Sequence, residues 1–536
     1  MASPPASSSS QTSYPMENDH TYLHGRINPG VEENFDLVES VPFERPQEEE
    51  LQQRNDLKGV PEDEVVSMSR PHPIVQPASP RSISTSPTSC PILDLPSELI
   101  DHVLSYLGPL DLVCVSRTCR VLSEQSKSDL SWQRHVQDNV PGVRLESPFP
   151  CKTFRELYIA HDPHWFLPRY KVWFCDIYLT GKLIITRYDQ STGVIEGYRL
   201  IAERPTPTFD PWEADDEVLI HSFTPRCHLH MDQPVLRLDA LSLESLMSTS
   251  GQTNPEHRFS AEIPMRMPER NHRGVFSNFL HTRPVEERAN MELWPPATIP
   301  ARHRVRNGTR NAYMGTGHKP QNRSQVSNQT FRIRRWLQMD IGARPPGIRH
   351  GEEVYTYATL DPKLWTPTEE KPYRGIWVGD YSGHGCEFLL MHQPDNEEPF
   401  DEASVVQGED ETLEEFEIRK REERIYRGSL EAIKLTGDPN VPRGEYTFIS
   451  DDISKTGFVR KATEDRFKGA RVVRSRGHIA ARMFRNDKYI ESQLIMISHD
   501  RLAQYWVGFG HISFYERVKI DDFLTPANDT IQTENC

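Results

Sequence analysis

Asp438 is the residue whose surroundings point most clearly to chemistry, because it lies in the loop GDPNVP (437–442). The two prolines stiffen this loop, and Pro439 directs Asp438 toward extended geometry, so that its carboxylate is held at a defined angle. An ionised carboxylate accepts hydrogen bonds and donates none. Ordinary turn formation also explains the Asp-Pro-Asn order, so both interpretations stay open. We take Asp438 and Asn440 as candidate substrate-binding residues.

A second candidate group lies in the stretch GIWVGDYSGHG (375–385). Three glycines surround His384 and permit close backbone approach or a positive φ at a strand junction, although a plain tight turn explains them equally well. Tyr381 and Trp377 offer an apolar wall beside a bound group, or else belong to a barrel core. His384, Tyr381 and Trp377 therefore join the predicted substrate-binding residues.

Residues suited to catalysis or metal binding are sparse. Cys227, His228 and His230 are close in sequence, but such a group without a second Cys or His pair rarely forms a zinc site. Cys386 lies in a predicted strand, where core packing is expected. The chain has no RING spacing, Walker loop, HExxH motif or nucleophile elbow. We predict a non-enzymatic protein with no catalytic residue, no metal and no cofactor.

The elements that must position the binding residues are mainly β-strands. After residue 154 the sequence contains short aromatic and β-branched runs with period-two alternation, among them KVWFCDIYL (171–179), GIWVGDY (375–381), CEFLLM (386–391) and SQLIMIS (492–498). This pattern, with many turn signals between the runs, is typical of an antiparallel barrel or sandwich. It predicts a β-rich domain over residues 150–525.

Two stretches interrupt the strand pattern. Residues 245–350 are rich in Arg, Asn and Pro with little periodicity, and their basic run FRIRRW (331–336) is expected to be a solvated loop in preference to a phosphate contact. Residues 395–427 are acidic and pass into LEEFEIRKREERIYRG, which favours a helix. Both stretches are predicted to be insertions.

A compact helical pattern precedes the strands, over residues 91–141. Ile100, Val103, Leu104 and Leu107 follow one another at helical spacing and form one apolar stripe. A second helix is predicted from Asp111, and a third short element contains Leu130 and Trp132. Three helices of this size cannot form a secure core alone, so their apolar surface should be covered by a neighbour or a partner.

The same module resembles the F-box. The sequence LPSELI (95–100), the Tyr106–Leu107 end of the first helix, Asp111–Leu112 and Trp132 all fall at the spacing of that family. The resemblance implies binding to Skp1 and, through Skp1, to a cullin and a RING subunit. The residues expected to contact Skp1 are Leu95, Pro96, Leu99, Ile100, Leu104 and Leu107.

The β-rich part resembles the F-box only protein thirty-one family, which carries a cyclin D1 binding type of domain. GIWVGDYSGHGCEFLLM (375–391) and LTGDPNVPRGEYTF (435–448) carry the resemblance, and together with looser matches it covers about half the chain. It implies that this domain captures the degron of a client protein, with known members reading chain ends. Since an ionised Asp438 would repel a free carboxylate, we expect a preference for an amide or otherwise uncharged C-terminus.

Composition sets the remaining limits. Residues 1–90 are rich in Ser, Pro and acidic residues and predict a disordered tail, and residues 526–536 a second short tail. The net charge of −16 disfavours nucleic acid and anionic membranes as partners. Because the chain shows neither a signal peptide nor a long apolar segment, we expect a cytoplasmic or nuclear protein with reduced cysteines.

The sequence therefore predicts an α+β protein: a disordered N-terminal tail, a small three-helix F-box module, and a mainly antiparallel β-barrel-like substrate domain with long insertions. Its predicted role is that of a substrate adaptor in a Skp1–cullin–F-box ubiquitin ligase. Two alternatives stay open from the residues. One is a barrel that carries a small ligand, and the other is an F-box scaffold that acts outside a ligase.

Overall fold

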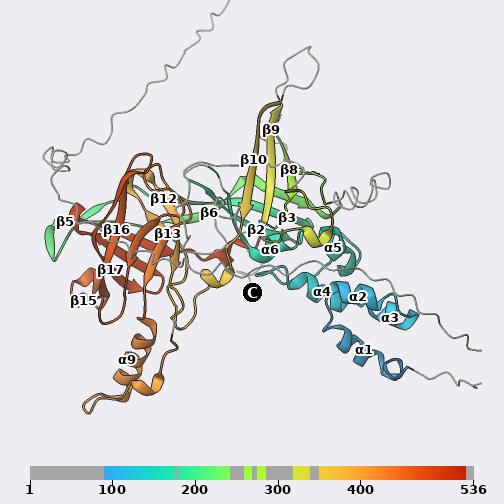
Figure 1. The fold of residues 1–536 in the computed structure, drawn as a ribbon, viewed down its shortest axis with the longest axis horizontal. Helices are drawn as coiled ribbons and strands as arrows, with labels where there is room; N and C mark the ends of the chain where they lie inside the picture. Colours follow the sequence, from blue (N-terminus) through green and yellow to red (C-terminus); the bar gives the residue numbers. More distant parts are fainter. Residues whose placement is uncertain are drawn as a thin grey trace, which may run out of the picture. The chain divides into compact units, whose positions relative to one another are not determined.

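A computed structural model of the protein describes residues 90–526, apart from 176, 178–179, 242–258, 268–274, 285–317, 339–348 and 397 (Figure 1). Residues 1–89 and 527–536, for which the sequence predicts disordered tails, lie outside the described residues. Residues 86–536 form one compact unit. As predicted, short helices come first and antiparallel β-sheet follows.

The helical module begins with a 3₁₀ turn and continues as four α-helices, where we had predicted three. These are η2 (Pro91–Asp94), α1 (Ser97–Leu104), α2 (Pro109–Val115), α3 (Arg120–Gln125) and α4 (Asp129–Gln137). The predicted second helix is divided after Val115, where two hydroxyls donate to backbone carbonyls, Ser116 Oγ to Val113 O at 2.7 Å and Thr118 Oγ1 to Val115 O at 2.8 Å. Such bonds compete with helix continuation.

The interior of this module is continuous with the protein that follows it. Ile100, Leu104, Leu112 and Trp132 belong to one buried cluster with α5 (Phe154–His161), α6 (Phe166–Tyr170) and residues of the first sheet. Trp132 also donates its indole N–H to Ser126 O at 2.8 Å. A set of short helices that is too small to be stable alone is thus supported by a larger neighbour.

The first sheet has eight antiparallel strands in the order β6-β3-β2-β1-β10-β9-β8-β7. Their bounds are Val172–Cys175 (β1), Lys182–Asp189 (β2), Val194–Glu203 (β3), Arg226–Asp239 (β6), Ile263–Pro264 (β7), Val275–His281 (β8), Thr330–Gln338 (β9) and Arg349–Ala358 (β10). Half of these strands fall in or at the end of the predicted insertion 245–350, so the prediction of a loop there was wrong.

The basic run FRIRRW explains the error, because it forms most of β9. Phe331 and Ile333 alternate into the core, whereas Arg332 and Arg334 occupy the opposite positions of the strand. Arg332 Nε donates to Thr356 Oγ1 at 3.2 Å, and Arg334 forms an ion pair with Glu262 at 3.1 Å. The arginines concealed a strand whose period-two pattern is present in the sequence.

The second sheet closes into a barrel of eight antiparallel strands. Its order is β11-β12-β13-β14-β16-β17-β18-β19, and β11 pairs again with β19. The bounds are Gly375–Asp380 (β11), Cys386–His392 (β12), Leu430–Lys434 (β13), Tyr446–Ser450 (β14), Arg471–Ala481 (β16), Arg485–Ser498 (β17), Arg501–Trp506 (β18) and His511–Arg517 (β19). The antiparallel barrel was predicted and is confirmed. Three further strands pair outside the ring: β4 (Phe209–Trp212), β5 (Asp215–His221) and β15 (Phe458–Lys461).

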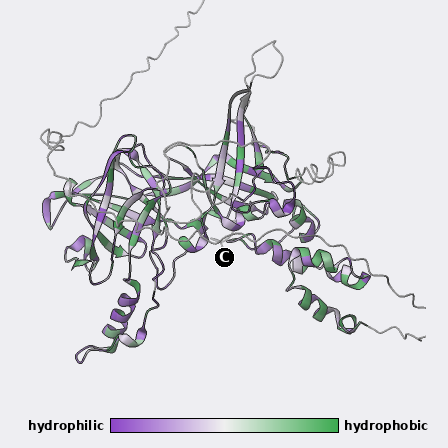
Figure 2. Ribbon diagram, viewed as in Figure 1, coloured by the Kyte–Doolittle hydropathy of each residue, from purple (hydrophilic) through white to green (hydrophobic). Residues whose placement is uncertain are grey.

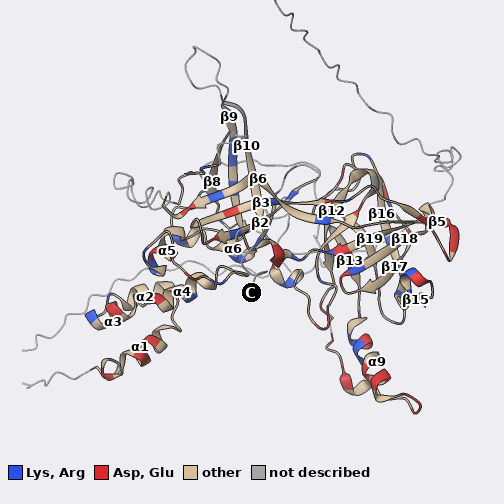
Figure 3. Cartoon of the chain, turned by 180° about the vertical axis from the view of Figure 1, so that it is seen from behind, with Lys and Arg blue, Asp and Glu red and all other residues tan. Residues whose placement is uncertain are grey.

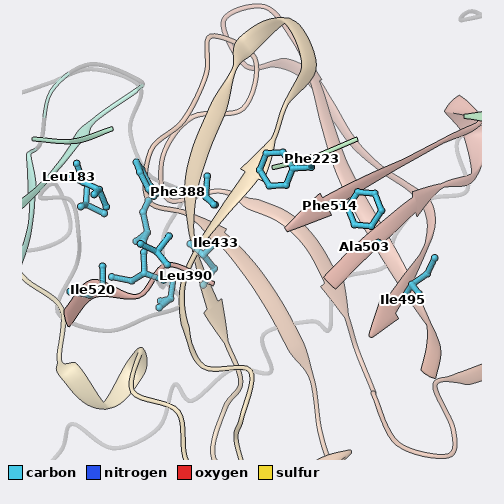
Figure 4. Packing of buried hydrophobic residues seen from close by; sticks show 14 of the residues in the cluster. Leu183, Phe223, Phe388, Leu390, Ile433, Ile495, Ala503, Phe514 and Ile520 are labelled. Atoms are coloured by element: carbon cyan, nitrogen blue, oxygen red, sulfur yellow. The ribbon is translucent and has the colours of Figure 1, made fainter. Parts of the chain in front are cut away.

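Successive side chains along the barrel strands point to opposite faces and so belong to two different apolar clusters. Trp377, Leu389 and Leu494 belong to a cluster of inward-facing residues, whereas Phe388 and Leu390 belong to a cluster shared with the first sheet. Figure 4 shows Leu183, Phe388, Leu390 and Ile433 among the side chains of this shared cluster. The barrel and the first sheet are therefore joined by buried apolar contacts, the strongest general source of stability.

The second predicted insertion, 395–427, contains the predicted helix as α9 (Leu413–Ile425). Thr412 and Glu415 form a capping box at its start, in which the Thr412 hydroxyl accepts from the Glu415 N–H. Acidic and basic residues are mixed along its surface (Figure 3), and its hydropathy is largely polar (Figure 2). Only its last residue, Ile425, is buried, and it joins the inward-facing cluster of the barrel.

Candidate functional site

The structure divides the six residues predicted to contact Skp1 into two groups. Leu95, Pro96 and Leu99 are exposed, with 50% of Leu99 accessible. Ile100 and Leu104 are buried, at 2% and 3%, in the core of the helical module, and their contact with Skp1 stays a prediction. Leu107 is half-buried and packs against the same core.

The exposed side of α1 and of the turn after it carries apolar residues that the sequence analysis did not group together. Leu99, Val103 and Tyr106 follow at i, i+4 and i+7 on the exposed side, and Leu110 at the start of α2 is exposed as well. The sequence contains a signal for this exposed surface, because the helix is apolar on two sides, whereas a surface helix usually has a single apolar side. An apolar stripe left uncovered over a well-packed core is typical of a protein interface.

The substrate-binding predictions converge on the mouth of the barrel. A cavity of about 280 Å³ there is lined by four of the predicted residues: Tyr381, His384, Asp438 and Asn440. Trp377, the fifth, does not line it. Its side chain is fully buried among the inward-facing residues and donates its indole N–H to Tyr373 O at 3.2 Å, so it is barrel core.

The glycines around His384 serve both purposes that the sequence left open. Tyr381 and Gly385 form a tight turn, in which the Tyr381 N–H donates to Gly385 O at 2.9 Å and Gly385 has a φ of +88°. At Gly379, a Cβ atom would lie 2.6 Å from the Tyr515 ring. The turn therefore needs one glycine for its backbone and another for a close ring contact.

The Asp438 carboxylate is already engaged within the protein. Its Oδ1 accepts the backbone N–H groups of Asn440 at 2.6 Å and Val441 at 2.8 Å, and its Oδ2 lies 2.5 Å from Lys434 Nζ. Burial opposes ionisation, but Lys434 and these hydrogen bonds hold the Asp438 pKa below its usual value. The loop uses the carboxylate as the turn interpretation predicts, and contact of Asp438 with a substrate stays a prediction.

Glu387 and Lys434 complete the floor of the mouth, and the sequence analysis missed both. Lys434 Nζ lies 2.8 Å from Glu387 Oε2 and 4.1 Å from the centre of the Tyr381 ring. Burial raises the Glu387 pKa to about 8, although Lys434 opposes the shift. The available signal was the alternation of CEFLLMH, in which Glu387 shares the inward face with Leu389 and Met391.

A hydrogen-bonded network continues from the mouth into the barrel. Tyr515 donates its hydroxyl to Gln504 Oε1 at 2.7 Å, and Gln504 donates in turn to Ser492 Oγ at 3.1 Å. Tyr381 and Thr447 share a hydroxyl hydrogen bond of 2.5 Å. These side chains satisfy one another inside the barrel, so they give the mouth a rigid base.

The thiols and histidines considered for catalysis or metal binding show no such arrangement. Within the described segments, no three His, Cys, Asp or Glu side chains come together as metal ligands. Burial raises the thiol pKa of Cys227 to about 12 and of Cys386 to about 11, so neither is a ready nucleophile. The described helices are all too short or too polar to cross a bilayer.

Comparison with known proteins assigns the two parts separately. Residues 92–138 match the F-box-like family, and residues 357–522 match the family described as the cyclin D1 binding domain. The first match coincides with the helical module and the second with the barrel. The protein thus contains an F-box-like domain. In particular, it combines the F-box with a cyclin D1 binding type of domain, as the resemblance implied.

One curated protein is similar to a part of this chain. The chain is 24% identical over 159 residues to Protein EXECUTER 2, chloroplastic, of Arabidopsis thaliana. The aligned part covers 30% of this chain and 22% of that protein, so the chain spans about a fifth of the relative's length.

Proposed function

We propose that this protein is the substrate-recognition subunit of a Skp1–cullin–F-box ubiquitin ligase. The carrying observation is the uncovered apolar stripe of Leu99, Val103 and Tyr106 on an F-box-like module whose own core is complete. Because nothing in the described part of the chain covers this stripe, it is available to Skp1, which connects an F-box to the cullin and RING subunits. The catalytic step belongs to those partners and their conjugating enzyme, and the chain itself acts as a non-catalytic adaptor.

The same proposal places the client's chain end in the barrel mouth. A cavity of about 280 Å³ is smaller than most ligand pockets, so it suits the last residues of a polypeptide. Its walls are held rigidly: the Met483 N–H donates to Pro439 O at 2.7 Å and fixes the Asp438 loop from outside. A pre-formed site loses little entropy when a short peptide end binds.

The charges on the floor favour an uncharged end. Asp438 compensates Lys434, and Glu387 is protonated below pH 8 or so, since burial raises its pKa to about 8. A free carboxylate would therefore be buried beside a lysine whose charge is already compensated, and burial of such an uncompensated negative charge is costly. A carboxamide carries no charge, and it both donates and accepts hydrogen bonds. The preference for an amide thus rests on the Lys434–Glu387–Asp438 group and not on Asp438 alone.

Fluorescence polarisation with one peptide, made as acid and as amide, tests this preference. We expect the wild type to bind the amide about tenfold more tightly, which corresponds to about 1.4 kcal/mol. Asp438→Asn removes the negative charge that compensates Lys434, so the acid should gain affinity and the difference should shrink. Equal binding of both peptides by the wild type would place the chain-end site elsewhere.

The two alternatives predict different partners. For a small-ligand carrier, the barrel would need an internal cavity, but Trp377, Leu389 and Phe448 fill its apolar half. An F-box scaffold outside a ligase would bind Skp1 without cullin. Affinity purification with mass spectrometry, with and without a proteasome inhibitor, separates these cases: an adaptor recovers Skp1 and cullin always, and clients more strongly with the inhibitor. We place this activity in the cytoplasm or nucleus as part of the same proposal.

A further inference from the structure

At the mouth of the barrel, the strand β19 pairs with two different strands along its length, β11 and β5. β11 pairs with the second half of β19, from Trp377 opposite Arg517 to Gly379 opposite Tyr515. The first half of β19 pairs instead in parallel with β5, where His511 lies opposite Leu219. The strand β4 then pairs with β5 as a hairpin. The strands β19, β5 and β4 thus extend the barrel wall into a lip beside the cavity.

A continuous row of rings crosses this lip. Phe509 and His511 both line the mouth cavity, and their ring centres are 6.0 Å apart. His511 stacks on His221 of β5 at 4.9 Å, and His221 meets Phe209 of β4 edge to face at 4.7 Å. The row therefore begins in the cavity and ends on the outermost strand of the sheet.

The row is exposed and apolar at both ends. Phe509 is 47% accessible, Phe209 53%, and Leu219 beside them 42%. Burial lowers the pKa of His511 to about 4 and also lowers that of His221, so both rings are uncharged near neutral pH. Several large apolar side chains exposed together are uncommon on a soluble surface unless they bind something.

We propose that this lip binds the segment of the client polypeptide that precedes its chain end, by holding one apolar or aromatic side chain. The inference rests on the proposed function, because it takes the chain end to lie in the cavity. A cavity of about 280 Å³ accepts only the last residues, so the polypeptide must leave across the rim.

The width of the lip limits the position of the apolar residue in the client sequence. Two strand spacings of about 4.8 Å separate β19 from β4, and an extended chain advances about 3.3 Å per residue, so roughly three residues cross the lip. The apolar side chain should therefore lie about three to six positions before the end of the client. The degron then consists of an uncharged end and an upstream apolar anchor.

Synthetic carboxamide peptides test the anchor. In a Gly-Ser background, a single Phe is moved one position at a time away from the end, and binding to the full chain is measured by fluorescence polarisation. We expect the wild type to bind about tenfold more tightly when Phe stands at the favoured positions, as burial of one aromatic side chain allows. Phe209→Ser and Leu219→Ser should abolish this gain and leave the binding of Phe-free peptides unchanged.

The matched control is Phe276→Ser on β8, another exposed phenylalanine that stacks on a neighbouring ring, Trp336, at 5.7 Å. This variant should retain the positional gain. If Phe gives no positional gain in the wild type, or if Phe209→Ser and Leu219→Ser retain it, the anchor is overturned while chain-end binding stands. If the wild type binds no peptide of the series, the proposed chain-end site fails and the anchor fails with it.

Discussion

Lys434 Nζ lies 2.8 Å from Glu387 Oε2 at the floor of the barrel mouth, with only 2% and 4% of the two side chains accessible. The Asp438 carboxylate also contacts this ammonium group, with its Oδ2 at 2.5 Å from Lys434 Nζ. One buried cation thus serves two carboxyl groups, and one of these is neutralised by a proton. The stability of the barrel and the charge of its mouth depend on the same three side chains.

Removal of this cation should destabilise the protein. We expect Lys434→Met to lower the free energy of unfolding by about 3 kcal/mol, because it leaves the buried Asp438 carboxylate without a counter-charge. Urea denaturation followed by tryptophan fluorescence measures the change. Lys455→Met is the control, since its ion pair with Glu423 is exposed on the lysine side and should contribute less than about 1 kcal/mol. A similar loss in both variants would contradict the role of burial.

Stability should also fall as pH rises through the range set by Glu387. Its pKa is raised from 4.5 to about 8 in the folded protein, so between these values the folded state holds a proton that the unfolded state has released. The contribution is complete below about pH 4.5 and is lost as pH rises through 8, with a slope of at most about 1.4 kcal/mol per pH unit. Glu387→Gln cannot ionise, so denaturation curves of the variant should lack this dependence.

The two sides of α1 should respond differently to mutation. Leu99→Ser together with Val103→Ser should reduce Skp1 capture about tenfold or more without unfolding the chain, because both residues are exposed. Replacement of Leu95 and Pro96 with Ala should weaken Skp1 binding by about 2 kcal/mol. Ile100→Ala should instead lower the free energy of unfolding by about 2 to 4 kcal/mol, because it leaves a cavity in the core. Pull-down paired with thermal denaturation separates these effects, and unchanged Skp1 capture by both exposed variants would remove the assigned interface.

The purified chain should transfer no ubiquitin by itself. The thiols of Cys227 and Cys386 have raised pKa values because they are buried, which leaves little thiolate at neutral pH. With activating and conjugating enzymes alone we expect no ubiquitin chains, and with Skp1, cullin and a RING subunit added we expect chains on a client. Cys227→Ser should behave as the wild type in both reactions. Chains formed without the partners would show that the chain has an activity of its own.

Local patterns determined the parts of this protein that depend on near neighbours. Helical spacing predicted the module that begins near Pro91, and period-two alternation predicted the antiparallel barrel. The segment LEEFEIRKREERIYRG predicted the helix α9. The stiff loop at Asp438 and the turn at His384 were recognised as parts of one site, and both line the barrel mouth. Side-chain periodicity and turn chemistry act over a few residues, so one sequence is enough to read them.

Only the tertiary structure decided the features that depend on distant partners. Leu99 and Ile100 are adjacent and both apolar, but Ile100 packs into the buried cluster of the helical module and Leu99 is left exposed. The pairing of β12 with β13, with Leu389 opposite Lys434, brings Glu387 to that lysine across 47 residues of chain. Burial and strand register are properties of the assembled sheet, so the charge of the site could not be read from either strand alone.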